Sequence, residues 1–121
     1  MGLEPAIQAL ASRAPVPVTV DADADDRLPG PVESAAYFVV SEALTNVAKY
    51  AQASQATVAV RRENGHVVVE VTDDGIGGAD VAHGSGLRGL ADRVAALDGK
   101  LSLESPAGRG TRLHAEIPFP P

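Results

Sequence analysis

Residues 56–72 read ATVAVRRENGHVVVEVT and carry a strong signal for a β-hairpin. Two runs rich in β-branched residues, 56–62 and 66–72, flank Glu63-Asn64-Gly65. An Asn-Gly pair between two such runs is typical of a tight β-hairpin. The stretch therefore predicts two neighbouring antiparallel strands.

The segment before this hairpin, residues 32–52, contains neither glycine nor proline. At about 100° per residue, a helix here would gather its apolar side chains on one face. These residues are Ala36, Val40, Ala43, Leu44, Val47 and Ala51. Glu42, Asn46 and Lys49 would form a narrow stripe on the opposite face, so the spacing predicts an amphipathic helix over 32–52.

Shorter patterns complete the chain on both sides of these elements. We expect helices over 3–13 and 87–98, the second ended by Gly99, and strands over 16–21, 100–105 and 111–117. Residues 21–31 and the glycine-rich stretch 73–86 read as loops, and the tail PFPP is expected to fray. This order predicts one domain over residues 1–121, an α+β two-layer sandwich with a mixed sheet and helices on one face.

Composition excludes several classes of protein. The absence of cysteine excludes disulfide frameworks and Cys-ligated metal sites. The net charge of −6 argues against a nucleic-acid partner, because such modules normally present a basic face. No apolar run approaches the ~20 residues that cross a bilayer. We expect a cytoplasmic domain without direct membrane contact, whether or not its parent protein is membrane-anchored.

The stripe of Glu42, Asn46 and Lys49 is the first candidate site. Such a stripe is usually a solvated helix face. Its chemistry also suits a triphosphate and a metal ion, because an Asn oxygen is a hard ligand for Mg²⁺ and a Glu can accept a proton or orient a metal-bound water. The Lys can meet a phosphate.

The glycine-rich stretch holds the second and third candidates. Asp73 ends an apolar strand, and its carboxylate could accept a hydrogen bond from the amino group of a flat ligand. Gly75 and Gly77 would let the backbone approach that ligand closely. Gly84 and Gly86 lead into a helix, whose N-terminus offers N–H groups to phosphate. Each pattern alone is equally typical of an ordinary turn or cap. The stretch Gly108–Thr111 reads mainly as a hairpin turn, with a hydroxyl that could reach a phosphate.

The four blocks in order resemble the ATP-binding catalytic domain of two-component sensor histidine kinases. They are SEALTNVAKYA (41–51), VTDDGIGG (71–78), GSGLRGLADRV (84–94) and GRGT (108–111), similar to the N, G1 and G2 boxes and a following turn. The wider ATPase class includes gyrase, mismatch-repair proteins and a heat-shock chaperone. The resemblance implies the Bergerat-type ATP-binding fold. Only six residues separate Gly77 from Gly84, as in the subgroup with a short lid.

The resemblance implies roles residue by residue. Asn46 would coordinate Mg²⁺, Glu42 would be the catalytic base, and Lys49 would contact phosphate. Asp73 would receive the adenine amino group beside Gly75 and Gly77. Gly84 and Gly86, with the adjoining Leu87, would lie near the phosphates, and Thr111 near the adenine-binding aspartate. Tyr50 stands where many members have His.

The resemblance further implies a histidine acceptor on a separate dimerisation domain and a response regulator as partner. None of His66, His83 and His114 lies on a predicted helix, so we expect the isolated domain to bind Mg-ATP without phosphorylating itself. Two alternatives remain at this stage: a Ser/Thr kinase of the anti-sigma-factor type, and a non-catalytic nucleotide-binding scaffold.

Overall fold

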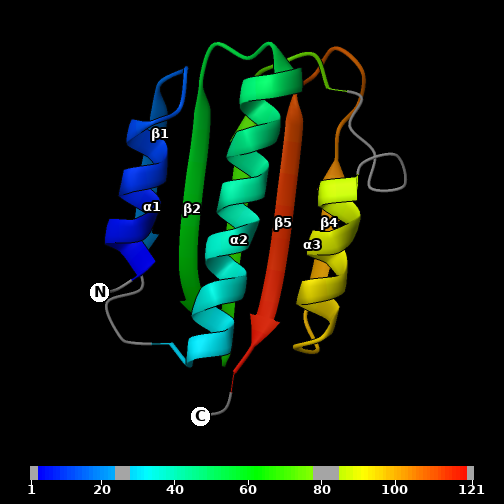
Figure 1. Ribbon diagram of the computed structural model, residues 1–121. Helices are drawn as coiled ribbons and strands as arrows, with labels where there is room; N and C mark the ends of the chain where they lie inside the picture. The colour runs from blue at the N-terminus through cyan, green and yellow to red at the C-terminus, as the bar shows by residue number, and fades with distance from the viewer. Residues whose placement is uncertain (1–2, 24–27, 78–84, 120–121) are drawn as a thin grey trace.

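Five strands form one mixed sheet in the computed structural model, which describes residues 3–23, 28–77 and 85–119 (Figure 1). The strand order is β1-β2-β3-β5-β4. β1 runs parallel to β2, and the other neighbouring pairs are antiparallel. The strands are β1 (Val18–Asp23), β2 (Ala56–Glu63), β3 (His66–Asp73), β4 (Lys100–Glu104) and β5 (Thr111–Pro118). The predicted mixed sheet is confirmed.

The central hairpin folds as its sequence predicts. β2 and β3 pair from Glu63 opposite His66 to Ala56 opposite Asp73. Asn64 and Gly65 form the turn with φ angles of 49° and 81°. Two consecutive positive φ values match the right-handed twist of the flanking strands, which explains why Asn-Gly stands here.

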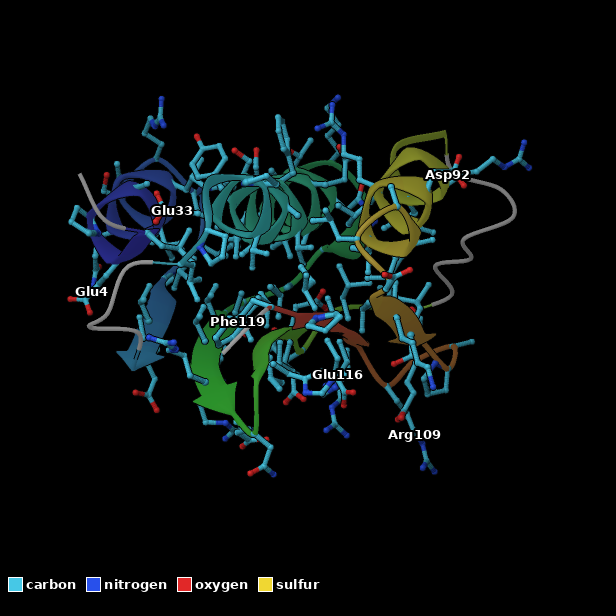
Figure 2. All side chains as sticks on the ribbon, turned by 90° about the horizontal axis from the view of Figure 1, so that it is seen from below. Glu4, Glu33, Asp92, Arg109, Glu116 and Phe119 are labelled. Carbon is cyan, nitrogen blue, oxygen red and sulfur yellow. The ribbon has the colours of Figure 1, made fainter. Side chains whose placement is uncertain are left out.

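Three helices cover one face of the sheet in the described residues (Figure 2). They are α1 (Leu3–Ser12), α2 (Gly30–Asn46) and α3 (Ser85–Ala95). The central helix buries Val39 and Val40, and alternate residues of the strands, such as Val67 and Val69, complete the core. This is the two-layer α+β sandwich that the order of elements predicts. In the described ranges, no helix is long and apolar enough to span a membrane.

The long helix differs from its prediction in the last turn. α2 ends at Asn46, and Val47–Ala51 continue as a π-helix, η1. Gln52 then takes the left-handed conformation with φ 50°, which turns the chain toward β2. The prediction of one regular α-helix over 32–52 is therefore wrong after Asn46. A π turn holds more residues than an α turn, so apolar spacing cannot reveal it.

Two predicted ends are also corrected. Asp98, rather than Gly99, takes the left-handed position after α3, with φ 61°, and the Gly99 N–H donates to the Val94 carbonyl at 2.9 Å. Gly99 is needed for close packing instead, because a Cβ there would lie 2.6 Å from the Glu116 carbonyl oxygen. The tail does not fray at Phe119, whose N–H donates to the Gly65 carbonyl at 2.9 Å.

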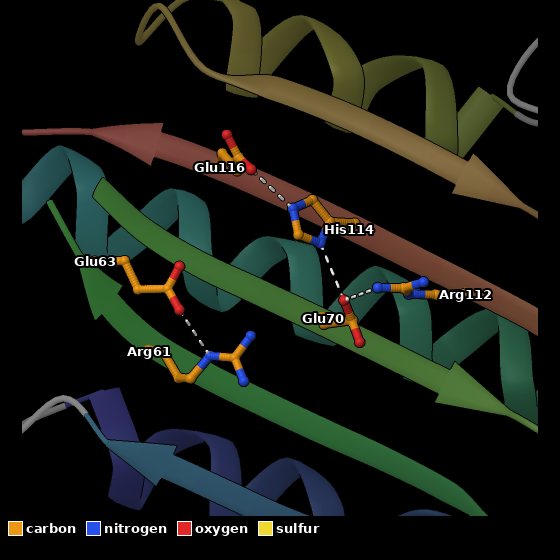
Figure 3. Close-up of polar contacts among 6 residues, drawn as sticks. All are labelled: Arg61, Glu63, Glu70, Arg112, His114 and Glu116. Atoms are coloured by element: carbon orange, nitrogen blue, oxygen red, sulfur yellow. Dashed lines mark hydrogen bonds and ion pairs between the residues drawn. The ribbon is translucent and has the colours of Figure 1, made fainter. Parts of the chain in front are cut away.

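The face of the sheet opposite the helices carries a network of charged side chains (Figure 3). Glu70 accepts hydrogen bonds from Arg112 at 2.9 Å and from His114 Nδ1 at 3.0 Å, while His114 Nε2 lies 3.2 Å from Glu116. These bonds lower the pKa of Glu70. Burial lowers the pKa of His114, but its hydrogen bonds with Glu70 and Glu116 outweigh burial and raise it overall.

Candidate nucleotide-binding site

Parts of three predicted blocks lie at one end of the molecule. The end of α2 with η1, the end of β3 and the turn between β4 and β5 all lie at the top of Figure 1. β2 and β3 join these parts, because Ala56 pairs with Asp73 and Asp73 pairs with Thr111. The topology thus brings residues 42–49, 73–77 and 108–111 to the same end of the two layers.

The first predicted stripe is divided between two kinds of helix. Glu42 and Asn46 lie on α2 and are half-buried, whereas Lys49 is exposed on η1. The neighbouring Ala43, Leu44 and Val47 are buried, which holds this part of the helix against the core. The amide and carboxylate therefore sit on a fixed support one turn apart, while the lysine lies beyond the regular α-helix.

Asp73 is the last residue of β3 and is half-buried. Val67, Val69 and Val71 are buried under the helices, and period-2 alternation places the Asp73 side chain on that same face. Its Oδ1 accepts the Gly75 N–H at 2.8 Å, which orients the carboxylate. The predicted delivery of this carboxylate from the end of a buried strand agrees with the structure.

Thr111 lies opposite Asp73 in the β3–β5 ladder, so the two predicted residues are neighbours. The Thr111 hydroxyl lies 2.7 Å from the Ser105 hydroxyl, which holds it at the start of β5. Thr111 and Asp73 are therefore adjacent, and their roles toward a nucleotide stay predictions.

The glycines of this region serve close packing between two loops. A Cβ on Gly77, whose φ is +68°, would lie 2.1 Å from the Pro106 carbonyl oxygen. A Cβ on Gly110, whose φ is +80°, would lie 2.2 Å from the Asp73 carbonyl oxygen. The Gly108 N–H also donates to the Ile76 carbonyl at 2.6 Å. The β4–β5 turn is therefore a support for residues 73–77, a role that its hairpin pattern does not reveal.

Asp74 is the residue of this end that the sequence reasoning missed. Its Oδ1 accepts the N–H groups of Ser54 at 2.8 Å and Gln55 at 3.1 Å, and its Oδ2 accepts the Ser54 hydroxyl. These hydrogen bonds, led by that from the Ser54 hydroxyl, lower the pKa of Asp74. Only the doubled aspartate hinted at it, and Asp is common in turns.

The third predicted block is described in part. Gly84 and His83 lie outside the described residues, and Gly86 lies in the first turn of α3. Leu87 is buried at 6% exposure, so its side chain belongs to the core. The start of a helix presents N–H groups suited to an anion, and phosphate binding here stays a prediction.

A shallow pocket of about 130 Å³ opens at the ends of β2 and β3. Its lining comprises Gln55, Ala56, Thr57, Thr72, Asp73 and Asp74. Thr57 and Thr72 alternate with buried residues and therefore face away from the helices. Asp73 thus borders this pocket together with residues of the strand face that points away from the helices.

Metal binding at this end would depend on the nucleotide. No group of three or more His, Cys, Asp or Glu side chains that could hold a metal ion occurs among the described residues. Mg²⁺ usually keeps several waters and binds through one or two protein oxygens together with phosphates. The half-buried Asn46 with Glu42 one turn earlier fits that pattern, in which the protein supplies few ligands.

Comparison with known proteins assigns the fold to a family of ATPases. Residues 32–121 match the family described as "Histidine kinase-, DNA gyrase B-, and HSP90-like ATPase". This match covers most of the chain, and the chain belongs to this family.

Individual relatives are sensor kinases. The chain is 34% identical over 97 residues to the oxygen sensor histidine kinase NreB of Staphylococcus carnosus, covering 77% of this chain and 28% of NreB. It is 28% identical over 95 residues to the sensor histidine kinase YxjM of Bacillus subtilis, covering 78% of this chain and 23% of YxjM. The chain thus spans about a quarter of the length of these curated relatives.

A solved structure shows the same arrangement. The blue-light activated histidine kinase EL346 of Erythrobacter litoralis superposes with a TM-score of 0.81 at 28% identity, covering 97% of this chain and 40% of that one. Together these findings identify a histidine-kinase type ATPase domain, for which ATP binding is the shared property. The predicted resemblance and fold class are confirmed, and the sensor-kinase interpretation is favoured over the two alternatives.

Proposed function

We propose that this domain binds Mg-ATP and donates its γ-phosphoryl group to a histidine on a separate dimerisation domain of the same parent kinase. A response regulator would then receive the group, and the domain would act in the cytoplasm. The observation that carries this proposal is that the Asn46 end of α2 and the Asp73 end of β3 lie at the same end of the molecule in a domain of this family. The named sensor kinases among its relatives support the acceptor class.

Each residue of the site has a proposed role. Asp73 accepts a hydrogen bond from the amino group of adenine. The Gly75 N–H donates to Oδ1, so Oδ2 is the oxygen proposed for that contact. Gly75 and Gly77 lie beside the base, and Thr111 supports this end. Gly84, Gly86 and Leu87 lie at the phosphates, with Leu87 contributing through its backbone because its side chain is buried.

At the triphosphate end, Asn46 offers its amide oxygen to Mg²⁺, and Glu42 is the proposed catalytic residue, holding a proton or orienting a water. Lys49, exposed on η1, is proposed to contact phosphate. Bound Mg²⁺ would neutralise charge on the triphosphate. The protein's own contribution is to hold the nucleotide in one position, because phosphoryl transfer needs little covalent assistance.

Calorimetric titration with ATP and Mg²⁺ tests the binding half of the proposal. We expect Asp73→Ala to weaken ATP binding about 10- to 100-fold, because a charge-assisted hydrogen bond contributes about 1.5–3 kcal/mol. Asn46→Asp should weaken the Mg²⁺-dependent part of binding. Thr72→Ala is the matched control, because Thr72 adjoins Asp73 on the strand but faces away from the helices. Unchanged affinity in Asp73→Ala would refute the assignment.

Reconstitution tests the transfer half. The domain is mixed with the dimerisation fragment of its parent kinase and radiolabelled ATP. Acid-labile label on the fragment supports the proposal, because phosphohistidine is acid-labile. Acid-stable label on Ser or Thr would favour the anti-sigma-factor type of kinase. ATP binding without any label would favour the non-catalytic scaffold.

A further inference from the structure

Asp74 stands beside the proposed adenine-binding residue and has no assigned role. Its carboxylate takes three hydrogen bonds, all from Ser54 and Gln55. Its own N–H donates to the Gln55 carbonyl at 3.4 Å. Four hydrogen bonds thus join the end of β3 to the segment just before β2. We call this set the Asp74 clamp.

The segment held by the clamp connects β2 to the helical part of the site, which contains Asn46 and Lys49. Ser54 and Gln55 follow Gln52, the left-handed residue that ends η1. η1 in turn begins directly after Asn46 and contains Lys49. Seven residues therefore separate Asn46 from Ser54. The clamp fixes the far end of that stretch to the residue after Asp73.

The Asp73–Asp74 peptide is held from the opposite side as well. Gly110 approaches the Asp73 carbonyl so closely that a Cβ would lie 2.2 Å from its oxygen. The peptide is consequently confined between the β4–β5 turn and the Asp74 clamp. The two neighbouring carboxylates have different partners among the described residues. Asp73 Oδ1 accepts the local Gly75 N–H, whereas both Asp74 oxygens accept from residues about twenty positions earlier.

We infer that Asp74 is a positioning residue, which sets the place of the adenine-binding aspartate relative to the Asn46 end of α2. This inference rests on the proposed role of Asp73. Asp74 itself needs no contact with nucleotide. Its carboxylate already accepts three hydrogen bonds from the protein, and its effect passes through the backbone that it shares with Asp73.

Asp74→Ala removes the three side-chain bonds of the clamp. We expect ATP affinity to fall about 2- to 30-fold, the range for residues that couple distant parts of a site. The preference for ATP over GTP should fall with it, because the misplaced Asp73 no longer reads the amino group of adenine. Simple destabilisation of the fold would weaken both nucleotides equally, so the ratio of the two affinities distinguishes positioning from stability.

Conservative variants sharpen the test. Asp74→Asn can keep every bond of the clamp, with Oδ1 accepting the two N–H groups and Nδ2 donating to the Ser54 hydroxyl, so it should restore near wild-type ATP affinity and preference. Ser54→Ala removes one bond of the four and should give a smaller loss than Asp74→Ala. It also provides the measurement if Asp74→Ala fails to fold. Glu4→Ala, which removes an exposed carboxylate on α1, is the charge-matched control.

The outcomes separate this inference from the proposed function. ATP binding by the wild type with unchanged affinity and preference in both Asp74→Ala and Ser54→Ala overturns the positioning role alone. Loss of affinity in Asp74→Asn equal to that in Asp74→Ala also overturns it, because the clamp geometry would then be irrelevant. Failure of the wild-type domain to bind ATP overturns the proposed function, and the positioning role with it.

Discussion

A pair of alanine substitutions in the β4–β5 turn tests whether close approach to Asp73 shapes the site. Gly108 and Gly110 have nearly the same backbone conformation, with φ angles of +81° and +80°. Alanine at either position would have to adopt a left-handed backbone conformation, which costs about 1–2 kcal/mol of folding free energy. Around Gly108 a Cβ would meet nothing within 4 Å, whereas at Gly110 it would lie 2.2 Å from the Asp73 carbonyl oxygen.

The difference between the two variants isolates the contact. Gly108→Ala should lower the free energy of unfolding by about 1–2 kcal/mol. Gly110→Ala should add a further ~1–3 kcal/mol, the usual cost of overpacking, because the clashing atoms are backbone and cannot rotate away. Gly110→Ala therefore consumes a large share of the roughly 5–15 kcal/mol that stabilises a domain.

Urea denaturation at constant temperature measures both free energies of unfolding, and calorimetry measures ATP affinity in the same samples. We expect Gly110→Ala to weaken ATP binding and Gly108→Ala to leave it close to wild type, since only the first displaces the Asp73 backbone. Equal losses of stability in the two variants, or full ATP affinity in a destabilised Gly110→Ala protein, would refute the reasoning.

Two further predictions concern stability away from the site. Gly89→Ala, at an exposed position inside α3 where a Cβ meets nothing within 4 Å, should raise the free energy of unfolding by about 0.5–1 kcal/mol in urea denaturation, and a decrease would contradict it. The pKa of His114 is raised in the folded state above its ordinary 6.5, so its stabilising effect is complete below that value and is lost as the pH rises through the folded pKa. The pKa of Glu70 is lowered below its ordinary 4.5, so its effect is present above that value and is lost as the pH falls through the folded pKa. The stability cost of His114→Gln should therefore be larger near pH 5.5 than near pH 8, and a cost independent of pH would contradict this.

The layers and the sheet could be predicted from the sequence because they follow from local periodicity. The Asn64-Gly65 turn and the alternation along β3 need no information from outside the hairpin. The π turn after Asn46 could not be predicted, because it depends on how the chain must leave the helix to reach β2. The glycine at position 99 suggested that the left-handed residue after α3 would be Gly99, but Asp98 takes that conformation. Position 99 requires glycine because of close packing against Glu116, a tertiary contact that the local pattern does not show.

The candidate site was predictable to the extent that its residues carry recognisable chemistry. Asp73 and Thr111 lie opposite each other, as the resemblance implies, although no local pattern pairs them. The supporting residues escaped notice because their roles are tertiary. In the sequence Gly110 resembles an ordinary turn glycine, and only the structure shows its close approach to the Asp73 carbonyl. Ser54, which donates to Asp74, belongs to no sequence motif.

The two adjacent aspartates show how the end of a strand can assign different roles to identical side chains. Asp73 still belongs to the β3 ladder, so the period of two turns its carboxylate to the face that the helices cover. Asp74 is the first residue beyond the ladder, and the N–H groups of Ser54 and Gln55 capture its carboxylate. A carboxylate that accepts three protein hydrogen bonds has little capacity left for a ligand, whereas one that accepts a single local bond has free lone pairs. This difference supports the proposals that Asp73 contacts the nucleotide and that Asp74 positions it.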